Sequence, residues 1–146
     1  MLARSVGRIL DLPWWIALGL GVSVSLVVAA TLSPAPSGVW GPCMRSMVLP
    51  IDPRDLVSRS DRALNTWLFV PLGFFAGFAA VKKVWVLVLA FGLPFVVEGL
   101  QRFVTVLDRR CQFQDLVDNT WGLILGAMVG IVVGFAAEAS QSTPRD

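Results

Sequence analysis

Residues 120–137 read TWGLILGAMVGIVVGFAA, and no other stretch of the chain constrains its fold as strongly. The stretch carries no charge, and Gly122, Gly126, Gly130 and Gly134 recur at every fourth position. A bilayer core of about 30 Å is crossed by roughly 20 helical residues, so this length is typical of a membrane span. Glycines four residues apart form a ridge on one helix face that lets a second helix approach closely. We therefore expect a transmembrane helix that packs tightly against a neighbour.

The composition of the whole chain also indicates a membrane protein. Of its 146 residues, 55% are hydrophobic and 15% are charged, compared with about 45–50% and about 25% in soluble domains. The mean hydropathy is +0.72. The net charge of +2 is too small to indicate nucleic-acid binding, and the absence of histidine excludes His-based catalysis. A soluble helical bundle is disfavoured because the apolar stretches are apolar on all faces rather than along one stripe.

Four apolar stretches predict an all-α, polytopic membrane protein with four transmembrane helices. Gly92 and Pro94 are expected to kink the third helix. Gly73 and Gly77 of the second helix are candidates to meet the glycine ridge of the fourth. The predicted helices cover residues 13–32, 63–81, 84–107 and 115–137.

The remaining segments follow from these helices. We expect a cytoplasmic N-terminus over residues 1–12, a long external loop over 33–62 and a polar tail over 138–146. Arg4 and Arg8 flank the first helix and favour an internal N-terminus, although the opposite side carries slightly more basic residues. A cleaved signal peptide is the alternative for the first stretch, but its apolar run is longer than the usual 7–15 residues.

Two cysteines fall in loops that this topology places on one face. Cys43 lies in the first loop and Cys111 in the third. On an external face they are candidates for a disulfide. Two free thiols are the alternative, and the spacing of the cysteines is not that of a metal site.

Polar residues gather at one predicted end of the bundle, because the second and fourth helices start where the third ends. Glu98 lies about 21 Å along the third helix from Val84, at 1.5 Å per residue. A carboxylate at that depth is costly in lipid, so we expect it to face the bundle interior and to mark a site. A purely structural network that ties the helix ends together is the alternative. The predicted ligand-binding residues are Asp61, Arg62, Asn65, Glu98, Gln101, Arg109, Asp115 and Asn119.

Several short motifs lie between residues 61 and 130: Asp61-Arg62-x-x-Asn65, Phe69-Val-Pro71-Leu72-Gly73, Glu98-x-x-Gln101, and Arg109 with Asp115, Asn119, Gly122 and Gly126. Together these motifs resemble the VanZ-like family of small bacterial membrane proteins. The resemblance implies a multi-pass protein of the bacterial cytoplasmic membrane, in a family named for resistance to the lipoglycopeptide teicoplanin. The family tends towards Lys and His where this chain has Arg62 and Asn65, which argues against a proton-transfer or metal role at Asn65 and leaves hydrogen bonding. The resemblance covers roughly residues 61–130.

The first functional hypothesis is a non-enzymatic one, in which an outward-facing polar pocket binds a lipid or a lipid-linked headgroup. Arg62, Arg109 and Arg110 would hold phosphate, because guanidinium groups match it with two hydrogen bonds. The expected partners are membrane lipids, lipid-linked cell-envelope precursors or a lipoglycopeptide. No cofactor and no metal are expected.

Two alternatives stay open. In the first alternative, the chain is an intramembrane hydrolase or transferase, and Glu98 and Asp115 are its general acid and base. In a variant of that hypothesis, carboxylates hold Mg²⁺, since this ion prefers oxygen ligands. The candidate carboxylates are Asp61, Glu98, Asp115 and Asp118. A structural or assembly partner within the envelope is the second alternative, and it requires no ligand at the polar end.

Overall fold

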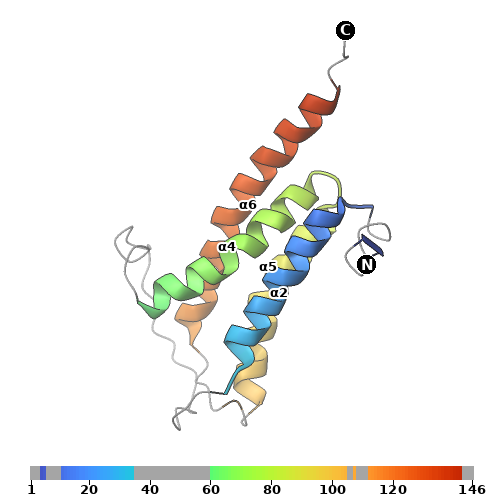
Figure 1. Ribbon diagram of the computed structural model, residues 1–146. Helices are drawn as coiled ribbons and strands as arrows, with labels where there is room; N and C mark the ends of the chain where they lie inside the picture. The colour runs from blue at the N-terminus through green and yellow to red at the C-terminus, as the bar shows by residue number, and fades with distance from the viewer. Residues whose placement is uncertain (1–3, 6–10, 35–59, 105–106, 108–111, 143–146) are drawn as a thin grey trace.

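A computed structural model describes residues 4–5, 11–34, 60–104, 107 and 112–142 of the chain. These residues form four long helices and no strand (Figure 1). The predicted all-α class with four membrane-spanning helices is confirmed, because all four are long and apolar enough to cross a bilayer. The helices are α2 (Trp14–Leu32), α4 (Asp61–Ala80), α5 (Val84–Phe103) and α6 (Phe113–Ser142).

The ends of the helices follow from local sequence. Ser60 caps α4, where its Oγ accepts a hydrogen bond from the backbone N–H of Ala63 at 3.3 Å, and Asp61 in the first turn is favourable beside the positive helix end. Helix α5 ends at Phe103, four residues before its expected end, and α6 continues to Ser142 instead of stopping near residue 137. Helix α5 is continuous through Pro94, and the kink expected there stays a prediction.

Helices α4 and α6 form the closest pair in the bundle and run parallel, side by side (Figure 1). A Cβ atom added at Gly122, Gly126 or Gly130 of α6 would overlap the backbone carbonyl oxygen of Thr66, Val70 or Phe74 of α4, respectively. The contact is reciprocal, because Gly73 and Gly77 of α4 meet the backbone of Leu123 and Ala127. Small residues on both helices therefore bring the two backbones into direct contact, as is typical of small-residue packing in membranes.

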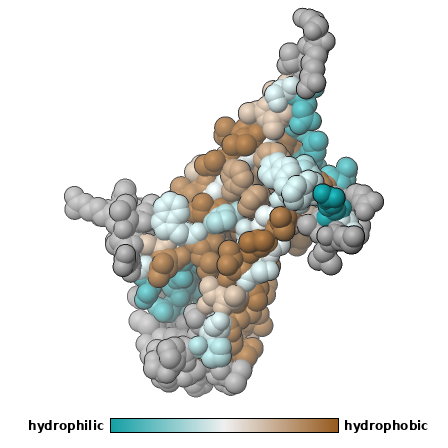
Figure 2. All heavy atoms as spheres, viewed as in Figure 1, coloured by the Kyte–Doolittle hydropathy of each residue, from teal (hydrophilic) through white to brown (hydrophobic). Residues whose placement is uncertain are grey.

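Helices α2 and α5 complete the bundle around α4. Trp15 of α2 packs edge-to-face on Phe78 of α4, with ring centroids 4.9 Å apart, and Gly19 leaves room for the Phe75 ring. Figure 2 shows an apolar surface over the middle of the molecule and polar surface towards both ends. An apolar exterior around an apolar core is expected of a protein whose solvent is lipid. The core is formed by buried residues that include Ile16, Val27, Phe69, Leu72, Val97 and Leu123.

The two ends of the bundle differ in chemistry. At one end, the short α4–α5 connection carries two lysines. Lys82 pairs with Glu138 at 3.6 Å, and Lys83 pairs with Asp11 at 3.7 Å. The C-terminal end of α6 projects beyond the other helices on this side (Figure 1), since its 30 residues span about 45 Å against a bilayer core of about 30 Å. The other end collects the starts of α4 and α6 and the ends of α2 and α5, and the predicted site residues lie there.

Candidate functional site

A partly buried ion pair joins α4 to α6 at this second end, which we call the polar end. Arg62 donates from Nε to Asp118 Oδ2 and from Nη2 to Asp118 Oδ1, each at 3.3 Å. Gln114 Nε2 donates to the same Oδ1 at 2.9 Å. Asp118 is 0% exposed, so these protein groups contact its carboxylate in place of water. Arg62 was predicted to hold a ligand phosphate, but in the structure it is bound to Asp118.

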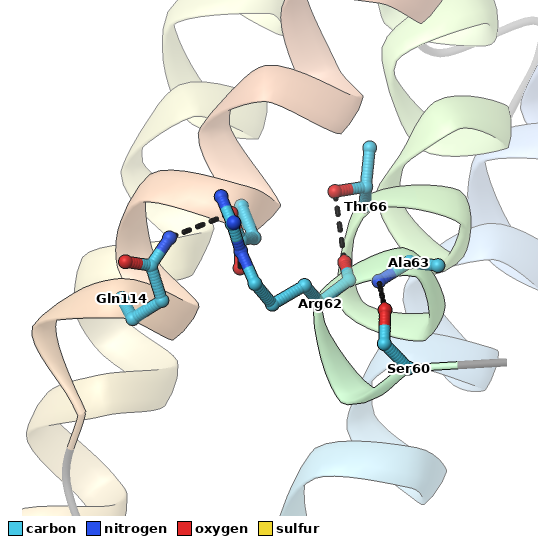
Figure 3. Close-up of polar contacts among 6 residues, drawn as sticks. Ser60, Arg62, Ala63, Thr66 and Gln114 are labelled. Carbon is cyan, nitrogen blue, oxygen red and sulfur yellow. Dashed lines mark hydrogen bonds and ion pairs between the residues drawn. The ribbon is translucent and has the colours of Figure 1, made fainter. Parts of the chain in front are cut away.

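The register of the glycine ridge places Arg62 opposite Asp118. Arg62 and Asp118 are 56 residues apart, and the same separation holds for Thr66 and Gly122 and is repeated up the α4–α6 contact. Each step of four residues moves one turn along both parallel helices. The ion pair is therefore the polar end of the row of contacts whose apolar part is the glycine ridge. Thr66 Oγ1 donates back to the carbonyl of Arg62 at 3.0 Å, which satisfies its hydroxyl locally (Figure 3).

Glu98 lies near the end of α5 and faces the start of α6. It is 8% exposed, and its Oε2 accepts a hydrogen bond from the backbone N–H of Gln112 at 3.3 Å. Its Oε1 accepts no hydrogen bond within the described part of the chain. Asp115, one turn into α6, is close enough to act electrostatically on Glu98. The expectation that Glu98 avoids the acyl chains agrees with this burial.

Gln101 links α5 to α2. Its Nε2 donates to the backbone carbonyl oxygen of Thr31 at 2.9 Å, and Gln101 is buried. Thr31 Oγ1 in turn donates to the carbonyl of Val27 at 2.6 Å. The last turn of α2 therefore belongs to the polar end, which the sequence did not indicate, since the acceptor is a backbone carbonyl that any residue would supply.

Asn119 and the remaining predicted residues complete the polar end. Asn119 is 2% exposed, and its Oδ1 accepts no hydrogen bond from any residue that the structure describes. Asp115 and Asn65 are half-buried, whereas Asp61 is exposed. Gly73 of α4 meets Leu123 of α6, 50 residues later in the chain. Asn65 and Asp115 are separated by the same number of residues, so they lie at the same level along the two parallel helices.

Some of the predicted features fall outside the described residues or find no counterpart among them. Arg109, Arg110, Cys43 and Cys111 lie outside the described residues, and with them the predicted phosphate contacts and the disulfide. The part of the chain that the structure describes contains no cluster of His, Cys, Asp or Glu suited to a metal. A hollow of about 180 Å³ lies at the opposite end, where Trp15, Phe78, Lys82 and Glu138 are among its lining residues. No predicted ligand-binding residue lines this hollow.

Two exposed tryptophans show the depth of the polar end in a membrane. Trp67 of α4 follows Arg62 by five residues and is 54% exposed, and Trp121 of α6 follows Asp118 by three residues and is 36% exposed. Exposed tryptophans of membrane proteins concentrate at the level of the lipid headgroups. We therefore expect the ion pair to lie at or just beyond the headgroup level, on the side away from the bilayer centre.

Fold and site together define a multi-pass α-helical membrane protein whose four helices contribute to a buried polar cluster at one end. A family model described as VanZ/LLP1 matches residues 22–134. The match covers most of the chain, and the chain belongs to this VanZ-like family, which confirms the resemblance. The matched region includes the polar end and the glycine ridge. Comparison with curated proteins and with solved structures finds no match.

Proposed function

We propose that this VanZ-like protein binds a lipid or a lipid-linked headgroup at the polar end of its bundle. The observation that carries the proposal is the pair of buried oxygen atoms, Glu98 Oε1 and Asn119 Oδ1, that accept no hydrogen bond from the described residues. Buried polar atoms in native proteins are nearly always hydrogen-bonded, and exceptions call for a specific explanation. A bound headgroup that donates hydrogen bonds to these atoms is such an explanation.

The position of the polar end supports a lipid rather than a soluble ligand. Trp67 and Trp121 mark the headgroup level next to it. A headgroup can therefore reach Glu98 while its acyl chains stay beside the apolar outer faces of α4, α5 and α6. We propose that this end faces outward from the bacterial cytoplasmic membrane. There it would meet lipid-linked envelope precursors or a lipoglycopeptide such as teicoplanin, and Arg109 would contribute a phosphate contact.

The test is the lipid content of the purified full chain. Glu98→Gln removes the carboxylate at nearly constant volume, and Glu138→Gln makes the same change at the opposite end, where Glu138 is 42% exposed. A hydrogen bond to a charged group is worth about 1.5–3 kcal/mol, so Glu98→Gln should lower co-purified lipid about tenfold or more. Equal lipid content in both variants, and in Arg109→Ala, would contradict the proposal.

A second candidate is an intramembrane hydrolase or transferase that acts on a lipid-linked substrate. It is favoured by the proximity of the Glu98 and Asp115 carboxylates, because two neighbouring acids bind protons with unequal affinity and can serve as acid and base. Release of phosphate or sugar from lipid-linked substrates by the wild-type chain, but not by Glu98→Gln, would support this candidate. Lipid binding without any release would favour the non-enzymatic function.

A further inference from the structure

The hollow at the end opposite the polar end forms where α4 and α6 begin to separate. The first three glycines of the ridge hold the two helices in backbone contact. At the fourth, Gly134, an added Cβ atom would lie 3.2 Å from the carbonyl oxygen of Phe78 instead of overlapping it. Helix α6 continues about two turns further, to Ser142. The start of α2 lies beside this gap, and the three helices line a hollow of about 180 Å³.

The lining of the hollow changes from apolar to charged along the helices. On α4, Phe78 precedes Lys82 by one turn, and on α6, Gly134 stands in the same relation to Glu138. The charged pair therefore lies at the outer rim, and the apolar lining lies towards the bilayer centre. Trp15 also lines the hollow and is 41% exposed, and exposed tryptophans concentrate at the headgroup level. Charge, interface and apolar surface thus follow one another in the order found along a phospholipid molecule.

The size of the hollow indicates that it holds part of a larger molecule. Its volume of about 180 Å³ is below the roughly 300–1,000 Å³ of pockets that enclose a drug-sized ligand. The rest of such a molecule must lie outside the hollow, where the surroundings at this depth are lipid. A phospholipid meets this requirement, because its phosphate and the start of one acyl chain can enter while the remaining chain stays in the bilayer.

Lys82 supplies the positive charge that a phosphate requires. Its Nζ lies 3.6 Å from Glu138 Oε1, beyond the length of about 2.7–3.2 Å of an N–H···O hydrogen bond. An exposed ion pair of this kind adds little to stability, so its ammonium can turn to a phosphate at small cost. Among the described residues of this end, the cations Arg4, Lys82 and Lys83 outnumber the anions Asp11 and Glu138.

We propose that this hollow binds a glycerophospholipid of the leaflet opposite the polar end. The lipid phosphate pairs with Lys82, and the glycerol esters lie at the level of Trp15. The start of one acyl chain packs against Phe78 and Gly134, where the missing side chain leaves room. The site shares no residue with the polar end and does not rest on the function proposed there.

Photo-crosslinking to the delipidated full chain in maltoside micelles tests this proposal. The rim is exposed, with Lys82 at 56%, so a lipid bound here exchanges readily and is probed by addition rather than by co-purification. The probe is phosphatidylglycerol with a photoreactive diazirine near the glycerol end of one acyl chain, and peptide mass spectrometry locates its attachment. We expect attachment to concentrate on the lining residues. Diacylglycerol with the same diazirine chain lacks the phosphate and should attach there about tenfold less.

Two pairs of variants test the charge and the space separately. Lys82→Gln should lower attachment in the hollow about tenfold, whereas Lys83→Gln removes the adjacent charge, which does not line the hollow, and should leave attachment unchanged. Ala137→Phe places a ring in the hollow and should abolish attachment there, whereas Ala136→Phe places it on an exposed face and should not. Lys82 is exposed, so its variant keeps the test decisive if Ala137→Phe folds poorly.

The contrary outcomes are distinct. Attachment spread evenly over the exposed apolar faces of the helices would mean that lipid is present here only as solvent, and would overturn the proposal. Equal attachment of diacylglycerol, or equal losses in Lys82→Gln and Lys83→Gln, would overturn the phosphate contact. Displacement of the probe by an equal concentration of glycerol 3-phosphate would assign the hollow to a soluble phosphate and overturn the lipid source. Each of these results would leave Glu98-dependent lipid binding at the polar end unaffected.

Discussion

The α4–α6 contact makes a sharp prediction about a single methyl group. Gly126→Ala places a Cβ atom against the carbonyl oxygen of Val70 and within 2.7 Å of the backbone nitrogen of Phe74. Both neighbours are backbone atoms, so no side-chain rotation can relieve the overlap and the helices must separate. Overpacking of a well-packed interior costs about 1–3 kcal/mol. Replacement of glycine by alanine within a helix returns about 0.5–1 kcal/mol.

Gly92→Ala is the matched control, because a Cβ atom at Gly92 meets nothing within 4 Å. It gains the same helical preference without the overlap, so the difference between the two variants isolates the steric cost. We expect Gly126→Ala to be less stable than Gly92→Ala by about 1–3 kcal/mol, measured by reversible unfolding of the full chain in mixed detergent micelles. Gly134→Ala should fall between them, since its nearest neighbour is the Val81 side chain at 2.8 Å, which can move.

Equal free energies of unfolding for Gly126→Ala and Gly92→Ala would refute the reasoning. Such a result would mean that α4 and α6 are not in backbone contact in the folded protein. The register that sets Arg62 opposite Asp118 would then lose its support as well.

Three further predictions concern polar contacts, all measured by the same unfolding assay. Arg62→Gln leaves the fully buried Asp118 without its cation and should lower the free energy of unfolding by about 3–5 kcal/mol. The double variant Arg62→Gln, Asp118→Asn should recover most of that loss. If the effects of the two substitutions simply add, the ion pair is contradicted. Gln101→Leu deprives the carbonyl of Thr31 of its donor and should cost about 1–3 kcal/mol, and a neutral effect would show that α2 is not held this way. Lys82→Ala breaks a pair whose side chains are 56% and 42% exposed and should change stability by less than about 1 kcal/mol; a larger loss would assign the hairpin a structural role.

Hydropathy alone predicted the helices and their common polar end, for a physical reason. A helix must be about 20 apolar residues long to cross a bilayer. Four successive spans alternate in direction, so the start of the second, the end of the third and the start of the fourth lie on the same side of the membrane. The end of α6 was placed too early because the residues after Ala137, Glu-Ala-Ser-Gln-Ser, are polar but contain no proline or glycine to stop a helix. Polarity marks where a helix leaves the membrane, not where it ends.

The partners within the polar end could not be predicted in the same way. Asp115 and Asp118 are both acidic residues near the start of α6. Arg62 pairs with Asp118 because the α4–α6 register sets these two residues opposite each other. That register depends on which of several glycines meets which carbonyl, and spacing alone does not fix it. The bond from Gln101 to Thr31 has an equally hidden acceptor, because a backbone carbonyl carries no sequence signal.

The close packing of α4 and α6 also explains how the fold tolerates nearby acceptors that have no donor among the described residues. A buried acceptor without a donor costs about 1–3 kcal/mol, so Glu98 Oε1 and Asn119 Oδ1 together cost about 2–6 kcal/mol. This is a large share of the roughly 5–15 kcal/mol that stabilises a typical domain. Asn119 cannot move to relieve the cost, because α6 is held by the glycine contacts above it and by Asp118 beside it. Unfavourable groups held rigidly on well-packed helices are expected of a site preorganised for a ligand. A ligand that donates to these acceptors should therefore stabilise the folded protein as well as bind to it.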